Sequence, residues 1–543
     1  MARGIKKTLR FALAITCGLV VAAPCYSAEG SEVRTQTGAI QGTSSEDGQV
    51  QIFKGVPYAA PPVGALRWKE PQPVPKWDGV RKATKFGARC MQGWIYDDMV
   101  FRDAGPSEDC LYLNVWTPKA AADAKLPVMV WIYGGGFQAG ATSEPRQDGE
   151  RLARLGVVVV SMNYRLGIFG FFSHPELTKE SRHHASGNYG LLDQAAALEW
   201  IRENIAAFGG DPQKVTIFGE SAGSVSVSAL MASPVSKKLM ARAMGESGAM
   251  FGKALKDGML RETEKTGSEF AKVMGVKSIE QLRGLDAQSV LDAALKNEEQ
   301  FKFRPNIDGY FLTTRPTEIY SRGEQAHVPL LAGWNRDEGS VEDFFEKEPV
   351  TKDNYVAKMK KLYGDAAGKA LRLFPTGNER EMKNSAELIS AANFIAYGTW
   401  KWIEMQGKTG GAAVYRYEFD QAPPRAEGDS GEGDPGRGRR RARVGSRGRG
   451  TDSRRKRVAS RPRACGLRSR RAAGATLVPA SDLRSPAVVR GRDASGDPRS
   501  RRARRHGRRA CRDRSPRGAA RARHTGSATA PAGVAVTVKS ETV

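Results

Sequence analysis

A serine lies between two glycines in a setting that suits nucleophilic catalysis. Gly219–Gly223 reads Gly-Glu-Ser-Ala-Gly, which places Ser221 in a G-x-S-x-G pattern. The apolar run Val215–Phe218 before it predicts a strand, and Val225–Met231 after it is compatible with a helix. A sharp strand-to-helix turn exposes the serine hydroxyl, and flanking glycines permit that turn. Short Gly-Ser patterns also occur in ordinary turns, but this position between a strand and a helix favours a nucleophile.

Three consecutive glycines upstream of this turn offer hydrogen-bond donors to a reaction intermediate. Gly134–Gly136 follow the apolar segment Val128–Tyr133. Attack on an ester carbonyl produces a negatively charged oxygen, which needs N–H donors held close to it. Glycine suits this task because a backbone without side chains can approach a substrate closely. A flexible turn at a strand end is the alternative for this segment, but together with Ser221 it favours an oxyanion site.

Buried strands that alternate with helices must position these groups. Val128–Tyr133 and Val157–Asn163 are almost entirely apolar, as expected of parallel strands covered on both faces. Between Leu191 and Ile205 apolar residues recur at helical spacing, and Gly209 then ends the helix. Further short strands are predicted at Val33–Gly42, Val50–Val56, Ala241–Met244, Val328–Trp334 and Ala412–Phe419. This alternation predicts an α/β fold with an open, mostly parallel sheet.

Two longer motifs identify a family resemblance. Glu108–Trp116 reads Glu-Asp-Cys-Leu-Tyr-Leu-Asn-Val-Trp, and Phe208–Pro212 runs on towards the serine turn. Together with the glycine segment, they resemble the type-B carboxylesterases, the carboxylesterase/cholinesterase family, over roughly residues 33–421. The resemblance implies an α/β-hydrolase fold with helices flanking a central sheet and Ser221 as the nucleophile. It also implies hydrolysis of small or medium uncharged esters through an acyl-serine intermediate, without a metal or organic cofactor.

The resemblance assigns roles to further residues. It implies that the N–H groups of Gly135, Gly136 and Ala222 form the oxyanion hole. The family places its triad acid in an Asp-Glu-Gly-Ser stretch after a late strand, which here is Asp337–Ser340, so Glu338 is the matching acid. An acid in this place orients the catalytic histidine and stabilises its protonated form. Without the resemblance, Glu338 would be interpreted as one surface carboxylate among many.

The histidine that completes such a triad has no counterpart in this sequence. In the family it lies on the loop after the strand predicted at Ala412–Phe419, but here the chain enters an arginine-rich region. We expect structural or solvated roles for all six histidines: His174, His183, His184, His327, His506 and His524. Without a base the serine hydroxyl is a poor nucleophile, and related hydrolases lose roughly 10⁶ in turnover. We therefore expect this chain to be inactive or severely impaired.

The sequence changes character near Pro423. From there to the C-terminus, 33 basic residues face 10 acidic ones, and Phe, Trp, Tyr, Ile and Met are absent. Such a composition cannot bury enough apolar surface to offset chain entropy, so we expect residues 423–543 to form a disordered, low-complexity tail. A GC-rich reading frame translated one base out gives this composition, which suggests a frameshift near Pro423. The hydrolase domain would then span residues 29–422 and be incomplete at its C-terminal end.

Residues 1–28 predict a secretory signal peptide, because a basic start precedes the apolar run Phe11–Ala23 and then small residues. The run is too short to span a bilayer comfortably, although an uncleaved anchor is the alternative. We therefore expect a secreted or periplasmic protein without stable membrane insertion. Export permits disulfides, and the spacing of Cys90 and Cys110 predicts one loop-closing bridge rather than a metal site. The family resemblance supports the same pair.

Three classes of function follow from these patterns. The first is a carboxylic ester hydrolase, or its disabled form, that acts on a small-molecule ester. The second is a non-catalytic binding protein on the same fold. The third is RNA or DNA binding through the basic tail, which holds most of the formal net charge of +26, since residues 1–422 carry 52 basic and 49 acidic residues. Predicted export and the absence of stacking aromatic residues argue against this third class, and the oligomeric state stays open.

Overall fold

The computed structural model describes residues 29–119, 123–251, 258–420, 475–479 and 536–538. The predicted signal peptide, residues 1–28, lies outside these ranges, as does most of the arginine-rich tail. Within the described ranges, no helix combines the length and the apolar character needed to cross a bilayer.

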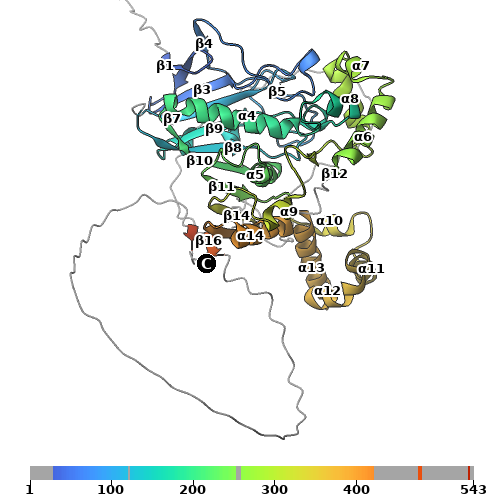
Figure 1. The fold of residues 1–543 in the computed structure, drawn as a ribbon. Helices are drawn as coiled ribbons and strands as arrows, with labels where there is room; N and C mark the ends of the chain where they lie inside the picture. Colours follow the sequence, from blue (N-terminus) through green and yellow to red (C-terminus); the bar gives the residue numbers. More distant parts are fainter. Residues whose placement is uncertain (1–28, 120–122, 252–257, 421–474, 480–535, 539–543) are drawn as a thin grey trace, which may run out of the picture.

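A central sheet of thirteen strands organises the molecule (Figure 1). Its N-terminal part is built mainly from antiparallel strands: β1 (Glu29–Arg34), β2 (Ala39–Ser44), β3 (Val50–Pro57) and β7 (Tyr112–Pro118), with β4 (Val80–Lys82) parallel to β2. Six parallel strands follow in the order β9 (Val158–Met162), β8 (Leu126–Ile132), β10 (Gly210–Glu220), β11 (Arg242–Glu246), β14 (Leu330–Asn335) and β15 (Val414–Phe419). The predicted α/β fold with an open, mostly parallel sheet is confirmed.

Two short segments of the tail extend this sheet beyond β15. β16 (Ala475–Pro479) pairs antiparallel with β15, and β17 (Val536–Val538) pairs parallel with β16. Both belong to the region expected to be disordered, so that expectation does not describe these two segments. Backbone pairing along the edge of β15 needs no aromatic side chain, and Val, Leu and Thr in these segments favour strands.

The helices pack against the sheet as its burial pattern requires. Every residue of β9 is buried. Of the longer helices, α4 (Tyr189–Asn204) packs against β10, and α5 (Ala222–Ala232) packs against β8, β10 and β11. Gly209, at φ 79°, ends the short 3₁₀ turn that continues α4, as predicted for this glycine. The remaining helices of this part are α1 (Glu150–Ala153), α2 (Gly167–Phe171), α3 (Pro175–Glu180), α6 (Leu260–Val273), α7 (Ile279–Arg283), α8 (Ala287–Lys296), α9 (Pro316–Ser321) and α14 (Tyr397–Thr409). Two small sheets pair β5 (Arg89–Cys90) with β6 (Pro106–Ser107) and β12 (Gly258–Met259) with β13 (Asn306–Ile307).

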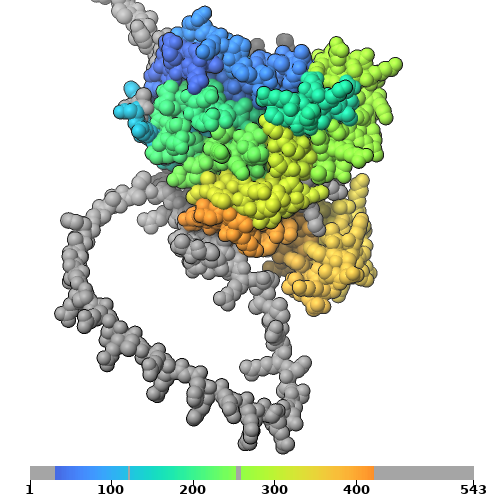
Figure 2. Space-filling model, in the orientation of Figure 1, coloured from blue at the N-terminus to red at the C-terminus, as the bar shows by residue number. Residues whose placement is uncertain are grey.

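Four helices form a protruding lobe with its own core (Figure 2). They are α10 (Val341–Phe345), α11 (Lys352–Tyr363), α12 (Ala367–Leu373) and α13 (Glu379–Ala391). Phe344, Tyr355 and Ile389 are among the buried side chains of that core. The lobe begins directly after the loop that carries Glu338, so it borders the region where the parallel strands end.

Candidate active site

The carboxyl ends of the parallel strands bring the predicted site residues to one edge of the sheet. β8 leads into Gly134–Gly136, and β10 leads into Ser221. β11 is followed by Ser247, and β14 by the loop that contains Glu338. Residues that follow parallel strands meet at the same edge, which is where open α/β sheets place their sites.

Ser221 occupies a strained turn between β10 and α5. Its backbone has φ 54° and ψ −120°, a conformation that costs a residue with a side chain on the order of 1–3 kcal/mol. Its N–H donates to the carbonyl oxygen of Glu246 at 2.9 Å, and its own carbonyl accepts from Val225 N–H at 2.9 Å, which starts the helix. The half-buried serine therefore stands at a sharp bend that the surrounding hydrogen bonds hold in place.

Close packing at this bend explains its glycines. A Cβ atom on Gly223 would lie 2.0 Å from the carbonyl oxygen of Ile132 at the end of β8, so only glycine fits there. A Cβ atom on Gly134 would lie 3.0 Å from Cβ of Ser221. The glycine segment and the nucleophile candidate therefore lie side by side, as the sequence predicted for an oxyanion site.

Backbone N–H groups around Ser221 are available to an incoming ligand. Gly135 and Gly136 have φ values of 103° and 64°, in the region that favours glycine. Within the described ranges, neither of their N–H groups donates a hydrogen bond to the protein. Ala222 is the first residue of α5, so its N–H has no partner inside the helix. These three groups are the ones that the resemblance implied for the oxyanion hole.

Glu338 is held by two residues that the sequence analysis did not identify. Its Oε1 accepts hydrogen bonds from Ser247 Oγ at 2.5 Å and from both the backbone N–H and Nδ2 of Asn335, at 3.1 and 2.8 Å. Ser247 is only 4% exposed, and its backbone φ of 51° is unusual for a residue with a side chain. Ser247 directly follows β11 and precedes a glycine, but the strand predicted here ended at Met244, so the sequence analysis did not mark it.

Three carboxylates lie near Tyr417 of β15. Burial raises the pKa of Glu246 above its ordinary value. The pKa of Tyr417 is also raised far above its ordinary value, mainly by burial. The nearby carboxylates of Glu246, Glu338 and Glu220 raise it further. A concentration of negative charge beside a nucleophile favours a protonated imidazole there, which is the form that a triad histidine adopts after it accepts the serine proton.

β15 ends beside the loop that carries Glu338. β15 lies next to β14 with Phe419 in register with Asn335, and Arg336 N–H donates to the carbonyl oxygen of Phe419 at 2.9 Å. The loop after β15 therefore starts beside the Glu338 loop. Residues 421–474, which come next, lie outside the described ranges, and the sequence from 421 to 505 contains no histidine.

The histidines within the described ranges serve other purposes, as expected. Nδ1 of His174 accepts from Glu176 N–H at 3.2 Å and caps α3. His183 stacks on Tyr310, His327 hydrogen-bonds through Nε2 to a backbone carbonyl at 2.8 Å, and His184 is exposed. None of these four contacts Ser221 or Glu338. His506 and His524 lie outside the described ranges.

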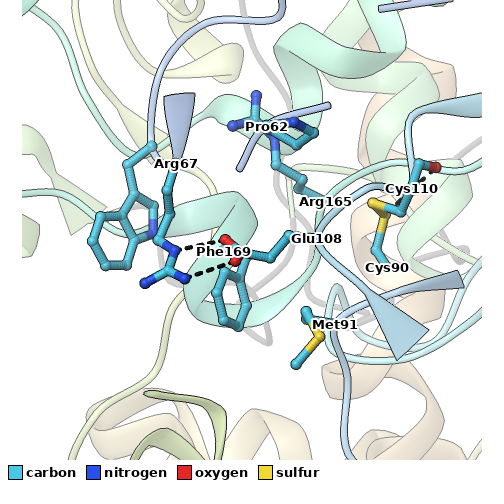
Figure 3. Close-up of a pocket in the computed structure, with 9 residues that line it drawn as sticks. Pro62, Arg67, Cys90, Met91, Glu108, Cys110, Arg165 and Phe169 are labelled. Atoms are coloured by element: carbon cyan, nitrogen blue, oxygen red, sulfur yellow. Dashed lines mark hydrogen bonds and ion pairs between the residues drawn. A yellow bond between two sulfur atoms is a disulfide. The ribbon is translucent and has the colours of Figure 1, made fainter. Parts of the chain in front are cut away.

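Cys90 and Cys110 form the predicted disulfide, with Cα atoms 4.9 Å apart. The bridge lines a small cavity beside Met91 and the ion pair of Arg67 with Glu108, whose two hydrogen bonds measure 2.6 and 2.7 Å (Figure 3). Ser221 does not line this cavity, so the cavity is separate from the candidate active site.

Among the described residues no group of three or more His, Cys, Asp or Glu side chains has the arrangement of a metal site.

The loop closed by this disulfide reaches the glycine segment. A Cβ atom on Gly136 would lie 3.3 Å from Oη of Tyr96, and one on Gly135 would lie 3.3 Å from Cε of Met99. Tyr96 and Met99 therefore lie next to these two glycines. The sequence analysis did not identify either residue, because no motif marks contacts made across a loop of this kind.

Comparisons with known proteins agree with this geometry. A sequence model described as the carboxylesterase family matches residues 29–436. The chain is 38% identical over 410 residues to a fumonisin B1 esterase of Sphingopyxis macrogoltabida, covering 72% of this chain and 71% of that protein. It is 38% identical over 403 residues to a para-nitrobenzyl esterase of Bacillus subtilis (strain 168), covering 72% of this chain and 78% of that protein.

Solved structures show the same relationship. A PNB esterase superposes with a TM-score of 0.62 at 37% identity, covering 73% of this chain and 80% of that one. A Geobacillus stearothermophilus carboxylesterase superposes with a TM-score of 0.61 at 34% identity, covering 72% of this chain and 80% of that one. The chain therefore belongs to the carboxylesterase family, whose members are serine esterases of the α/β-hydrolase fold.

Proposed function

We propose that the site is that of a carboxylic ester hydrolase with Ser221 as the nucleophile. The N–H groups of Gly135, Gly136 and Ala222 are proposed to bind the oxyanion, and Glu338 to orient a histidine. The observation that carries this proposal is the strained conformation of Ser221 at a strand-to-helix turn, with the glycine segment directly beside it. A protein maintains such strain where function requires it.

The proposed reaction proceeds in two steps. The Ser221 hydroxyl attacks the ester carbonyl, its proton passes to a base, and the alcohol leaves after receiving that proton. Water then attacks the acyl-serine, and the acid is released. The fixed N–H donors stabilise the negative oxygen in both tetrahedral intermediates, which is commonly worth 10²–10³-fold in rate per donor.

We further propose that this chain is severely impaired because the base is missing. Supporting this, β15 ends beside the loop that carries Glu338, yet the sequence contains no histidine between Phe419 and His506. Related hydrolases without their base lose roughly 10⁶-fold in turnover number. Their oxyanion donors and substrate binding still give a rate about 10³-fold above that of the uncatalysed reaction in water. A frameshift near Pro423 is the proposed origin, and it would place the domain boundary near residue 422.

Export to an oxidising compartment forms part of the proposal. The signal-like residues 1–28 and the buried Cys90–Cys110 bridge support it, because disulfides of this kind persist outside the cytosol. The proposed substrate is a small-molecule ester, in line with the esterases that the chain resembles. We expect no specific nucleic-acid partner in spite of the basic tail.

Hydrolysis of p-nitrophenyl esters tests this function. Three proteins are compared: the chain itself, its Ser221→Ala variant, and a version in which the reading frame at Pro423 is corrected. We expect weak hydrolysis by the chain that Ser221→Ala abolishes, and a rate higher by several orders of magnitude in the corrected version. Equal rates for the chain and Ser221→Ala, with no gain in the corrected version, would favour the non-catalytic binding protein instead.

A further inference from the structure

The central sheet ends at a strand whose outer edge is only partly covered. β15 pairs with β14 on its inner side along its whole length. On its outer side it pairs with β16, which lies at this end of the sheet (Figure 1), through residues 415–417 alone. Within the described ranges, Glu418 and Phe419 therefore have no strand partner on that side, and Phe419 is 40% exposed.

An edge of this kind can bind a further strand. Its unpaired N–H and C=O groups can form a ladder with another extended chain, which is why proteins usually protect such edges. β15 reads Val-Tyr-Arg-Tyr-Glu-Phe, and β-branched and aromatic residues of this kind favour strands. It contains no proline or glycine that would weaken pairing. The outer edge of β15 is therefore suited to pairing with a strand of another molecule.

The order of residues in β15 favours the same strand as its partner. In an antiparallel pair of identical strands, residues at equal distances from the centre lie directly opposite each other. With Tyr417 at the centre, Arg416 lies opposite Glu418 of the second copy, and Tyr415 lies opposite Phe419 of the second copy. Opposite charges and aromatic pairs in such positions stabilise a sheet. A centre at Arg416 or Glu418 would instead place like charges opposite each other, which is destabilising.

The structure holds Arg416 in a position that suits this pairing. Its guanidinium lies over the ring of Trp334, 4.6 Å from the ring centroid. Nη2 of Arg416 is 3.6 Å from Oε2 of Glu418, which lies on the same face of the strand. In the pair of strands, each arginine would have one glutamate beside it in its own strand and another opposite it in the second copy. The charges therefore alternate in sign across the interface.

We propose that the outer edge of β15 is a self-association surface, on which two copies of this chain pair their β15 strands antiparallel around Tyr417. β16 occupies part of the same edge and competes with the second copy. A segment of the same chain competes at a high effective concentration, so the intact chain is mainly monomeric and loss of β16 allows the dimer. The dimer has a two-fold axis, as most homodimers do. This inference does not depend on the proposed esterase activity.

Sedimentation velocity over a series of protein concentrations tests this inference. In the full chain, Leu477→Pro/Val478→Pro removes the two N–H groups at the centre of β16, because proline cannot donate to a ladder. Ala472→Pro/Ala473→Pro is the matched control, since it adds the same prolines to the tail outside β16. We expect the β16 variant to dimerise at least about tenfold more tightly than the unaltered chain and the control, because two copies of β16 no longer have to be displaced.

Charge reversal in the β16 variant tests the register. Arg416→Glu places glutamates opposite each other and should weaken the dimer roughly tenfold, since the pair occurs twice in a symmetric dimer. Arg416→Glu/Glu418→Arg exchanges the charges and should restore the dimer. A β16 variant that stays monomeric, an unaltered chain that dimerises equally well, larger aggregates in place of a dimer, or a dimer that does not follow these charge changes would each overturn the inference. Ser221-dependent ester hydrolysis is measured separately and tests only the proposed function.

Discussion

The hydroxyl group of Ser247 donates a hydrogen bond of 2.5 Å to Oε1 of Glu338. Ser247 directly follows Glu246, whose carbonyl oxygen accepts the N–H of Ser221 at 2.9 Å. Two successive residues at the end of β11 thus connect the proposed nucleophile to the proposed acid. This connection joins Ser221 to Glu338 without a histidine from the described ranges.

Removing the Ser247 hydroxyl should destabilise the protein through its effect on Glu338. We expect Ser247→Ala to lower the free energy of unfolding by about 1–3 kcal/mol, since the carboxylate loses a buried donor. In a Glu338→Gln background the same substitution should cost less, because a neutral amide oxygen is a weaker acceptor. Urea unfolding of the unaltered chain, the two single variants and the double variant gives the coupling energy between Ser247 and Glu338. Additive effects of the two substitutions would show that the hydrogen bond contributes nothing.

The strain at Ser221 makes a prediction about glycine. At φ 54° and ψ −120°, glycine avoids the cost that any Cβ atom causes, so Ser221→Gly should be more stable than Ser221→Ala by about 1 kcal/mol. Lys265, an exposed residue of α6, supplies the control: there the order reverses, with glycine about 1 kcal/mol less stable than alanine. Thermal unfolding of both pairs measures the difference. The same order at both positions would contradict strain at Ser221.

Partly buried Glu246 should make stability depend on pH. Burial raises its pKa, so the folded state holds this proton more tightly than the unfolded state. Its contribution is then fully present below the ordinary carboxyl pKa and is lost as the pH rises through the folded value. We expect Glu246→Gln to increase the free energy of unfolding at pH 8 but not at pH 4. Glu203→Gln, at an exposed position of α4, controls for the chemical change. A benefit that is the same at both pH values would refute this explanation.

The Cys90–Cys110 bridge should contribute substantially to stability. It closes a loop of 20 residues in sequence separation, for which chain entropy predicts about 3 kcal/mol. We expect the double variant Cys90→Ala/Cys110→Ala to unfold at correspondingly lower urea concentration. A reducing agent should lower the stability of the unaltered chain towards that of the variant and leave the variant unaffected. Identical midpoints for both proteins without reductant would show that the bridge has no such role.

Much of the fold could be predicted because its signals are local. Apolar runs such as Val128–Tyr133 identify buried parallel strands, and Gly209 marks a helix end through its backbone conformation. Ser221 and the glycine segment were also accessible, since a strained turn requires particular residue types close together in sequence. Glu338 became visible only through the family motif around it, because one carboxylate has no distinguishing sequence pattern of its own.

The remaining parts of the site depend on contacts between distant segments. Ser247 meets Glu338 across 91 positions of the chain, and Tyr96 meets Gly136 through a loop without a motif. The two tail strands β16 and β17 were missed for a different reason: composition describes an average over the tail, whereas pairing needs only a few suitable residues.

Rescue by imidazole tests most directly whether the base alone is missing. Imidazole in solution can act as the base at Ser221, so Ser221-dependent hydrolysis of p-nitrophenyl acetate should rise with imidazole concentration and saturate. Ser221→Ala should show only the reaction of imidazole with the ester in solution, and Glu338→Gln should show a smaller rescue. A rate that does not exceed that of Ser221→Ala at any imidazole concentration would contradict a site that lacks only its histidine.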